Sequence, residues 1–312
     1  MSKDLRNVYI AFEVIIAVLA ILGNLLVIWV LKLNQGFQKT IFYFIISLAV
    51  ADIAVGLVMP ATIVVALELE MPYKTCLFMC CLPVTFTQAS IMSLLAIAID
   101  RYLRVRLLVR YKLITTERRI RVALGTVWLL SLLVGFTPMF GWRNEIPKNT
   151  SNVACLFTSV MKMEYLVYLS FFTGTLGPLV VMCVLYTRLF YIIRSKLCSC
   201  NGRGHSVFYK HEFKTAKSLT LVFFFFAICW LPMCILNCFT LFSSLQIPPY
   251  VVYMAIVLSH SNSVMNPIIY AFRIKKFRKT CIQIFRTYFP KVDTEQDTSN
   301  GHTSSDPFYI IC

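Results

Sequence analysis

Long apolar segments separated by short charged segments dominate the chain. A helix needs about 20 apolar residues to cross the hydrocarbon core of a bilayer, and seven stretches reach that length: residues 8–32, 41–67, 76–100, 120–141, 164–193, 218–242 and 249–272. Because the bilayer core has no water to pair with backbone N–H and C=O groups, these stretches are predicted to be helices. The pattern therefore predicts an all-α membrane protein, a seven-transmembrane helix bundle over residues 8–272.

Composition and charge agree with this fold and predict its orientation. Only 14% of the residues are charged, against about 25% in soluble proteins. An odd number of spans places the termini on opposite sides, and 24 of the 30 Lys and Arg residues fall on the side of the C-terminus. Since cytoplasmic loops carry the excess of Lys and Arg, residues 1–7 are predicted to be extracellular and the C-terminus cytoplasmic. The net charge of +16 then reflects topology and indicates no nucleic-acid partner.

The sequence after the last span divides into two parts. Residues 273–289 mix basic and apolar positions, which predicts a short amphipathic eighth helix that contacts lipid on the inner membrane face. Cys281 in this segment lies beside the inner leaflet and is a candidate for palmitoylation. Residues 290–312 are polar and rich in Ser and Thr, which predicts a disordered cytoplasmic tail.

The outer loops carry two signs of an extracellular environment. Asn149-Thr150-Ser151 is an N-glycosylation sequon on the predicted outer side. Cys76 and Cys155 both face the oxidising side, and a disulfide between them is expected. The other cysteines lie mostly in apolar runs without metal-site spacing, so buried thiols are the simpler interpretation and no metal site is predicted.

Ionisable residues inside the spans are the candidates for function. Glu13, Asp52, the pair Asp100-Arg101 and His260 all fall within predicted spans, where a charge is costly to bury. Each could instead be paired only for helix packing. The spans hold no clustered His/Asp/Glu or Cys/His set of the kind an enzyme needs, and no repeated broken spans typical of a transporter. The sequence therefore predicts neither an enzyme nor a transporter.

A set of short motifs occurs in order along the spans: Gly23-Asn24, Leu48-Ala49-Val50-Ala51-Asp52, Asp100-Arg101-Tyr102, Trp128, Pro178, Cys229-Trp230-Leu231-Pro232 and Asn266-Pro267-Ile268-Ile269-Tyr270. With these motifs the chain resembles a rhodopsin-like G-protein-coupled receptor over residues 8–290. The resemblance implies signalling from the plasma membrane to a heterotrimeric G protein.

That resemblance also implies a switch at the inner end of the bundle. Arg101 would be held by Asp100 and Glu212 at rest, and activation would swing the sixth span outward about Pro232, where the helical hydrogen-bond ladder is broken. The residues that would complete the switch are Tyr102, Tyr186, Pro267 and Tyr270. An allosteric sodium ion is expected at four polar positions: Asp52, Ser90, Asn262 and Asn266.

The ligand class can be narrowed. No lysine lies in residues 249–272 to bind retinal, and Pro83 stands where amine receptors carry an aspartate. Several stretches are instead similar to the adenosine receptors: Ser90–Ala98 with Asp100–Val105, Thr137–Trp142, Glu212–Leu219 and Leu258–His260. Ser170 resembles the A-three form, whereas Gln88 and Phe272–Ile274 resemble the A-one form.

The adenosine-receptor resemblance implies a ligand site. Phe157 would stack on adenine, Asn237 would hydrogen-bond its amine and a ring nitrogen, and Ser259 and His260 would hold the ribose. The remaining expected members are Glu13, which would orient His260, and Thr87, Gln88, Trp230, Met233 and Ile256 on the pocket wall. Without that resemblance, a loop aromatic and a helix-packing amide would be the simpler interpretations of Phe157 and Asn237.

Coupling to an inhibitory G protein, with a fall in cyclic AMP, is the further expectation from this resemblance. Six Ser and Thr residues in the tail would serve receptor kinases and arrestin: Thr294, Thr298, Ser299, Thr303, Ser304 and Ser305. Pro60, Pro83 and Gly174 depart from the family pattern in the outer half of the bundle. The alternative is therefore a rhodopsin-like receptor whose altered pocket recognises another purine-like or unknown small ligand.

Overall fold

A computed structural model of the chain describes residues 3–33, 39–145, 152–199, 203–243, 247–273 and 275–288. Two of the sequence predictions lie outside these residues, namely the glycosylation site Asn149 and the disordered tail 290–312.

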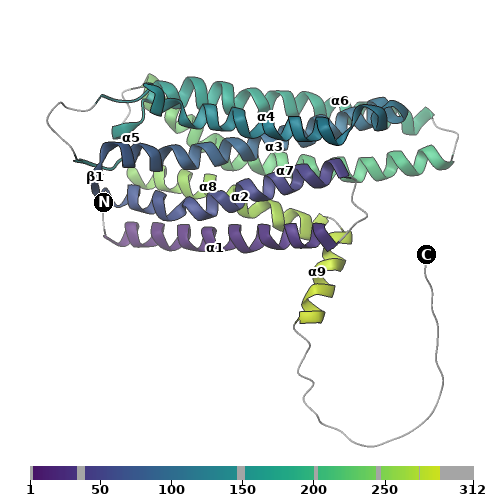
Figure 1. Ribbon diagram of the computed structural model, residues 1–312, viewed down its shortest axis with the longest axis horizontal. Coiled ribbons are helices and arrows are strands. Elements are labelled where there is room, and N and C mark those ends of the chain that lie inside the picture. Colours follow the sequence, from purple (N-terminus) through teal and green to yellow (C-terminus); the bar gives the residue numbers. More distant parts are fainter. Residues whose placement is uncertain are drawn as a thin grey trace, which may run out of the picture.

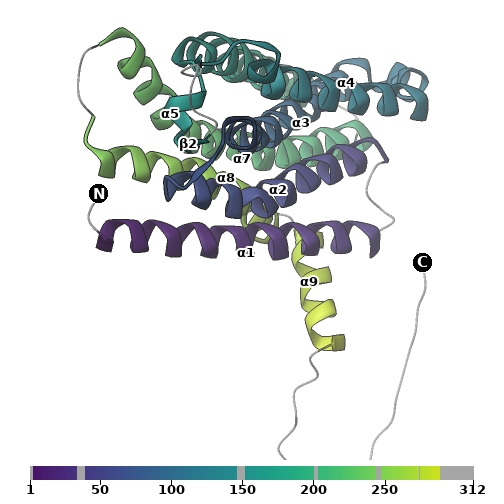
Figure 2. The same ribbon diagram turned by 60° about the vertical axis from the view of Figure 1, so that its left-hand side comes forward.

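Seven long helical segments lie side by side along the long axis of the molecule (Figures 1 and 2): α1 (Lys3–Leu33), α2 (Lys39–Ala66), α3 (Tyr73–Ile114), α4 (Glu117–Phe136), η2 (Tyr165–Leu176) continued by α6 (Gly177–Ser199), α7 (Arg203–Phe242) and α8 (Pro249–Arg273). They correspond in order to the seven predicted spans. The fifth segment differs from the others because its first part, η2, is a π-helix. A further helix, α9 (Lys275–Tyr288), leaves the bundle at a steep angle (Figure 1).

Among the described residues, six of these segments are both long and apolar enough to cross a membrane: α1, α2, α3, α4, η2 with α6, and α7. The helix α8 is long enough, but polar residues lower its hydropathy. Five of them are buried in the bundle: Ser259, His260, Asn262, Ser263 and Asn266. Because these side chains face other helices, they need not contact lipid, and α8 completes the bundle as the seventh span.

Several helices continue beyond the predicted spans. The helix α3 reaches Ile114 and α7 begins at Arg203, both at the end of the bundle that is predicted to face the cytoplasm and is called the inner end below. The predicted spans followed only the apolar stretch, whereas a helix can continue into water with charged residues on its surface. The inner part of α3 is interrupted at Leu108, whose φ of 27° and ψ of −79° are not helical.

The outer end of the bundle is covered by short elements. Strands β1 (Glu70–Pro72) and β2 (Asn152–Ala154) pair antiparallel, and they are followed by the one-turn helix α5 (Phe157–Val160). These elements lie at the end where α1 begins, and α9 lies at the opposite end (Figures 1 and 2). The predicted disulfide between Cys76 and Cys155 is present and ties β2 to α3. The loop is held further by Asn144, whose Nδ2 donates to the carbonyls of Thr158, Ser159 and Met161.

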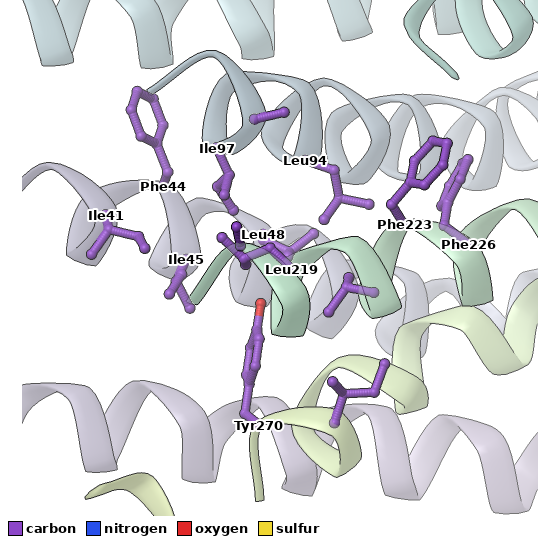
Figure 3. Close-up of a cluster of buried hydrophobic side chains, with 14 of the residues drawn as sticks. Ile41, Phe44, Ile45, Leu48, Leu94, Ile97, Leu219, Phe223, Phe226 and Tyr270 are labelled. Carbon is purple, nitrogen blue, oxygen red and sulfur yellow. The ribbon is translucent and has the colours of Figure 1, made fainter. Parts of the chain in front are cut away.

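The largest apolar core lies in the inner half of the bundle, as part of it in Figure 3 shows. It joins α2, α3, α7 and α8 through Ile41, Phe44, Ile45, Leu48, Leu94, Ile97, Leu219, Phe223, Phe226 and Tyr270. The outward faces are also apolar, with Leu22, Leu57 and Val122 each more than 60% exposed. Because lipid is as apolar as these side chains, close packing and polar contacts must hold the helices together.

Candidate functional site

A cavity of about 490 Å³ opens in the outer half of the bundle. This volume lies within the range of about 300–1,000 Å³ that is typical of small-molecule sites. Nine of the ten predicted ligand residues line it: Thr87, Gln88, Phe157, Trp230, Met233, Asn237, Ile256, Ser259 and His260. The structure therefore brings together side chains from α3, α5, α7 and α8 that are up to 173 positions apart in the sequence.

Helical periodicity and the disulfide explain this convergence. Trp230, Met233 and Asn237 lie three and four residues apart on α7, so they form one stripe along the helix. Phe157 is two residues beyond Cys155, and the disulfide to α3 fixes the loop that carries it. The wall of the cavity thus depends on the outer loop as well as on the helices.

Glu13, the tenth predicted residue, contacts His260 instead of the cavity. His260 Nδ1 lies 2.9 Å from both carboxylate oxygens of Glu13, and the Glu13 side chain is fully buried. A carboxylate partner at Nδ1 selects the ring form that carries a proton there and leaves Nε2 for another partner. The neighbouring Ser259 hydroxyl donates to the carbonyl of Ile256 at 2.7 Å, so its oxygen remains available as an acceptor.

Asp52 lies deeper, in the middle of the bundle, and is fully buried. Ser90 Oγ donates to its Oδ1 at 3.2 Å and Asn266 Nδ2 donates to its Oδ2 at 2.6 Å. Asn262, the fourth predicted member, is buried one turn before Asn266 on α8. No Lys, Arg or His of the described residues forms an ion pair with Asp52. An uncompensated carboxylate among neutral oxygen groups fits a small, hard cation such as sodium.

The inner end of the bundle holds the predicted ion pairs. Arg101 contacts Asp100, with its Nη2 2.5 Å from Oδ2, and its Nη1 lies 3.5 Å from Oε2 of Glu212 on α7. Tyr186 on α6 and Tyr270 on α8 are both buried. The Tyr270 hydroxyl points into the apolar core (Figure 3) and has no hydrogen-bond partner in the part of the chain that is described.

Two residues that the sequence interpretation missed extend this network. Arg104 Nε lies 2.7 Å from Glu212 Oε1, whereas Arg101 Nη1 lies 3.5 Å from Oε2 of the same carboxylate. The Tyr111 hydroxyl donates to Asp100 Oδ1 at 2.6 Å. Burial, together with the Asp100 carboxylate, raises the pKa of Tyr111, so its hydroxyl keeps the proton that it donates. We call Asp100, Arg101, Arg104 and Glu212 the inner ion-pair cluster.

Arg104 could have been found from the sequence, since it follows Arg101 by three positions and therefore lies on the same helical face. Tyr102, a predicted switch residue, lies outside the cluster, and its hydroxyl accepts from Arg106 at 3.0 Å.

The predicted switch prolines lie inside helices, Pro232 in α7 and Pro267 in α8. A proline has no N–H, so the carbonyl four residues earlier loses its helical partner. For Pro267 this is the carbonyl of Ser263, and Asn24 Nδ2 of α1 donates to it at 2.9 Å. A side-chain amide thus satisfies the break in α8.

Gln88 makes a contact that the sequence interpretation did not predict. It lines the cavity as expected, yet its Nε2 donates to the carbonyl of Gly174 in η2 at 2.7 Å, and only 2% of the residue is exposed. The amide nitrogen of Gln88 is therefore bonded to η2, the first part of the fifth segment.

The predicted palmitoylation residue Cys281 lies in α9. Phe277, Thr280 and Ile284 form the buried face of this helix, and Cys281 beside them is half-buried. Burial raises the pKa of the Cys281 thiol.

Comparison with known proteins identifies a family that agrees with the seven-helix bundle. The family model of the 7 transmembrane receptor (rhodopsin family) matches residues 23–270. Adenosine receptor A3 of Canis lupus familiaris is 56% identical over 292 residues, which cover 91% of this chain and 93% of that protein. Adenosine receptor A3 of Ovis aries and that of Bos taurus are 56% and 55% identical over 284 residues, which cover 89% of each chain.

Proposed function

Because the chain belongs to the rhodopsin family of seven-transmembrane receptors, and within it to the adenosine receptors, we propose that it binds extracellular adenosine and activates an inhibitory G protein, which lowers cyclic AMP. As a member of this family it is a multi-pass plasma-membrane receptor and not an enzyme. The observation that carries the proposal is the identity of 56% over 91% of the chain, an extent that includes the helices around the cavity.

The chemistry of the cavity supports a nucleoside ligand. Phe157 offers an aromatic face for a planar base, and the Asn237 amide offers a donor and an acceptor side by side, as the edge of adenine requires. His260, oriented by Glu13, and the free oxygen of Ser259 hydrogen-bond the ribose hydroxyls. The base and the sugar thus each have polar partners, so few of the ligand's polar groups are buried without one.

The inner ion-pair cluster supports the switching mechanism. Arg101 on α3 and Glu212 on α7 hold the inner ends of these helices together in the resting state. Agonist binding against Trp230 favours the state in which α7 moves outward about Pro232, and this movement separates the two charges. Tyr186 and Tyr270 then hydrogen-bond the released Arg101, and the opened inner face admits the G protein.

An allosteric sodium ion is part of the proposal. Asp52, Ser90, Asn262 and Asn266 would hold it, and its positive charge would offset the buried carboxylate and favour the resting packing.

The excess of Lys and Arg on the α9 side supports a cytoplasmic C-terminus and an extracellular N-terminus. On the cytoplasmic side, receptor kinases phosphorylate the tail and arrestin binds it. On the same side α9 lies against the membrane, and an acyl group on Cys281 inserts into the lipid. Glycosylation at Asn149 belongs to the opposite side.

The test is a cyclic AMP assay in forskolin-treated cells that express the chain and are titrated with adenosine. We expect a fall in cyclic AMP that pertussis toxin abolishes. Asn237→Ala should weaken the response about 100-fold, because two hydrogen bonds to the ligand are lost at about 1.5 kcal/mol each. Ile235→Ala, on the lipid-exposed face of the same helix, is the matched control and should respond like the parent.

Binding of a radiolabelled adenosine agonist to the same membranes separates recognition from coupling. If the agonist binds but cyclic AMP does not fall, the proposed coupling to an inhibitory G protein is wrong and the proposed ligand stands. No binding by a chain that reaches the cell surface would reject adenosine, and the departures at Pro60, Pro83 and Gly174 would then favour another purine-like ligand.

A further inference from the structure

The contact between Gln88 and Gly174 joins α3 to the π-helical segment that forms one wall of the cavity. We propose that Gln88 is a positioning residue: its amide replaces a helical donor that Pro178 removes, and together with Gly174 it fixes the shape of this wall and hence the ligands that fit. The proposal rests on the proposed function only for the choice of the ligand used to test it.

The first argument concerns the missing donor. Gly174 lies just before the point where the π-helical spacing of η2, in which the N–H of Gly177 donates to the carbonyl of Phe172, changes to the α-helical spacing of α6. In the α-helical spacing the carbonyl of residue 174 would accept from the N–H of residue 178, and residue 178 is a proline, which has none. The Gly174 carbonyl is buried in the bundle, away from water that could replace the lost bond. Gln88 Nε2, at 2.7 Å, supplies a donor to this oxygen from the neighbouring helix.

The second argument concerns space. A Cβ atom at position 174 would lie 2.7 Å from Gln88 Oε1 and 3.1 Å from Gln88 Nε2. The first distance is shorter than real side-chain contacts allow, so any other residue at this position would displace the amide. Glycine at 174 and glutamine at 88 are therefore complementary, and either substitution breaks the same contact.

The third argument is that the structure uses the same arrangement a second time. Asn24 Nδ2 of α1 donates to the carbonyl of Ser263, which lies four residues before Pro267 in α8. In both places a buried amide from an adjacent helix donates to the carbonyl four residues before a proline. The repetition indicates that each amide stabilises a proline-broken helix in one conformation.

The consequence for the cavity follows from the residues around Gly174. Ser170, Phe171 and Thr175 belong to the same π-helical segment and line the cavity. Thr175 Oγ1 donates to the Ser170 carbonyl five residues earlier, so these side chains depend on the π-helical spacing. Loss of the Gln88 contact would allow this segment to change its pitch, and the three cavity residues would shift with it.

The first test is a double-mutant cycle read by affinity for a radiolabelled adenosine agonist. Gln88→Met keeps the bulk of the side chain but has no donor, and we expect it to weaken binding about tenfold. In Pro178→Ala, which restores an N–H at position 178, the same Gln88→Met change should weaken binding less than twofold. A direct ligand contact of Gln88, with no role for Gly174, would instead give the same loss in both backgrounds and would overturn the proposal.

A second pair of variants tests the space argument. Gly174→Ala should reproduce the loss caused by Gln88→Met, and the double variant should be no worse than either single one, because both changes break one contact. Gly177→Ala is the matched control, since a Cβ there would meet only the Phe172 carbonyl at 3.6 Å. If Gly174→Ala binds like Gly177→Ala, the proposal is wrong. If Gly174→Ala does not reach the cell surface, the cycle with Pro178 decides alone.

A readout without ligand keeps the proposal distinct from the adenosine assignment. Ser170→Cys places a thiol on the cavity wall, and its rate of reaction with a charged methanethiosulfonate reagent is measured relative to the parent, which has its own cysteines. Gln88→Met should change this rate at least threefold, and Pro178→Ala should reverse most of the change. An unchanged rate would overturn the positioning role even if adenosine binds, and a changed rate would support it even if adenosine does not.

Discussion

Arg104 is predicted to contribute more than Arg101 to holding α7 in the resting position. Its Nε lies 2.7 Å from Glu212 Oε1, whereas Arg101 Nη1 lies 3.5 Å from Glu212 Oε2. Arg101 is also engaged by Asp100, while Arg104 has the Tyr111 and Phe208 rings beside its guanidinium group. Substitution of Arg104 should therefore release α7 in part, without removing the arginine that the active state requires.

The size of the effect follows from the burial of the pair. A hydrogen bond to a charged group contributes about 1.5–3 kcal/mol. The lower end applies to Arg104, because 18% of its side chain is exposed and Arg101 remains near Glu212 after the substitution. About 1.5 kcal/mol corresponds to roughly a tenfold rise in the ratio of active to resting receptor. Glu212→Gln removes the charge that both arginines contact and should raise the ratio further.

The assay is ligand-free activation of the inhibitory G protein, measured as nucleotide exchange in membranes with equal amounts of receptor. Arg104→Met, which keeps most of the apolar stem, should raise basal exchange clearly above that of the parent. Arg110→Met is the matched control, since Arg110 is exposed on the same helix and has no ion pair among the residues that the structure describes.

Two results would refute this reasoning. If Arg104→Met matches the parent while Glu212→Gln raises basal exchange, Arg101 alone holds α7 and the shorter Arg104 contact has no role. If Arg110→Met raises basal nucleotide exchange as much as Arg104→Met does, the increase comes from the loss of positive charge on the inner face and not from the loss of the contact with Glu212.

Three further predictions concern the outer half and the centre of the bundle. Glu13→Gln should weaken agonist binding about tenfold in a radioligand assay, because His260 loses the carboxylate that fixes its ring; an unchanged affinity would contradict the orienting role. Asp52→Asn should make agonist affinity insensitive to replacement of sodium chloride by choline chloride, and persistent sensitivity would place the ion elsewhere. Cys155→Ser should lower agonist affinity at least tenfold in receptors sorted for surface expression, since Phe157 loses its tether to α3; full affinity would show that the loop is held without the disulfide.

The spans and their order could be predicted from the sequence, because a helix that crosses lipid must be apolar over about 20 residues. This requirement does not apply to residues outside the membrane, which is why the inner parts of α3 and α7 extend beyond the predicted spans. It is also relaxed inside the bundle, since α8 carries buried polar residues that lower its hydropathy. The sequence analysis included residues 249–272 among the seven stretches of sufficient apolar length, and the motif Asn266-Pro267-Ile268-Ile269-Tyr270 agreed with that prediction.

Contacts in the candidate site could be predicted where a family motif implied them. They could not be predicted where they depend on how a helix is rotated about its axis. The contact of Glu13 with His260 was expected from the family resemblance, and the structure has it. The contact of Gln88 with Gly174 depends on which face α3 turns toward η2, and neither composition nor periodicity contains that angle. The π-helix could not be predicted either, because an apolar segment such as Tyr165–Leu176 crosses a membrane equally well as an α-helix.

The carbonyls four residues before the helix prolines differ in whether a side chain donates to them, and this difference bears on how movement near the cavity could reach the inner ion-pair cluster. Amide side chains donate to the carbonyls four residues before Pro178 and Pro267. In the described part of the chain no side-chain donor is recorded for the carbonyls four residues before the other prolines inside helices: Pro60, Pro83 and Pro232. Pro83 and Pro232 lie in the two helices that the ion pairs with Glu212 join, α3 and α7. The helix α3 is also tied at its outer end by the disulfide between Cys76 and Cys155. When those pairs separate, α7 has an open break about which to move, while the neighbouring segments remain fixed by their amides, and two discrete packings of one helix are what a receptor switch requires.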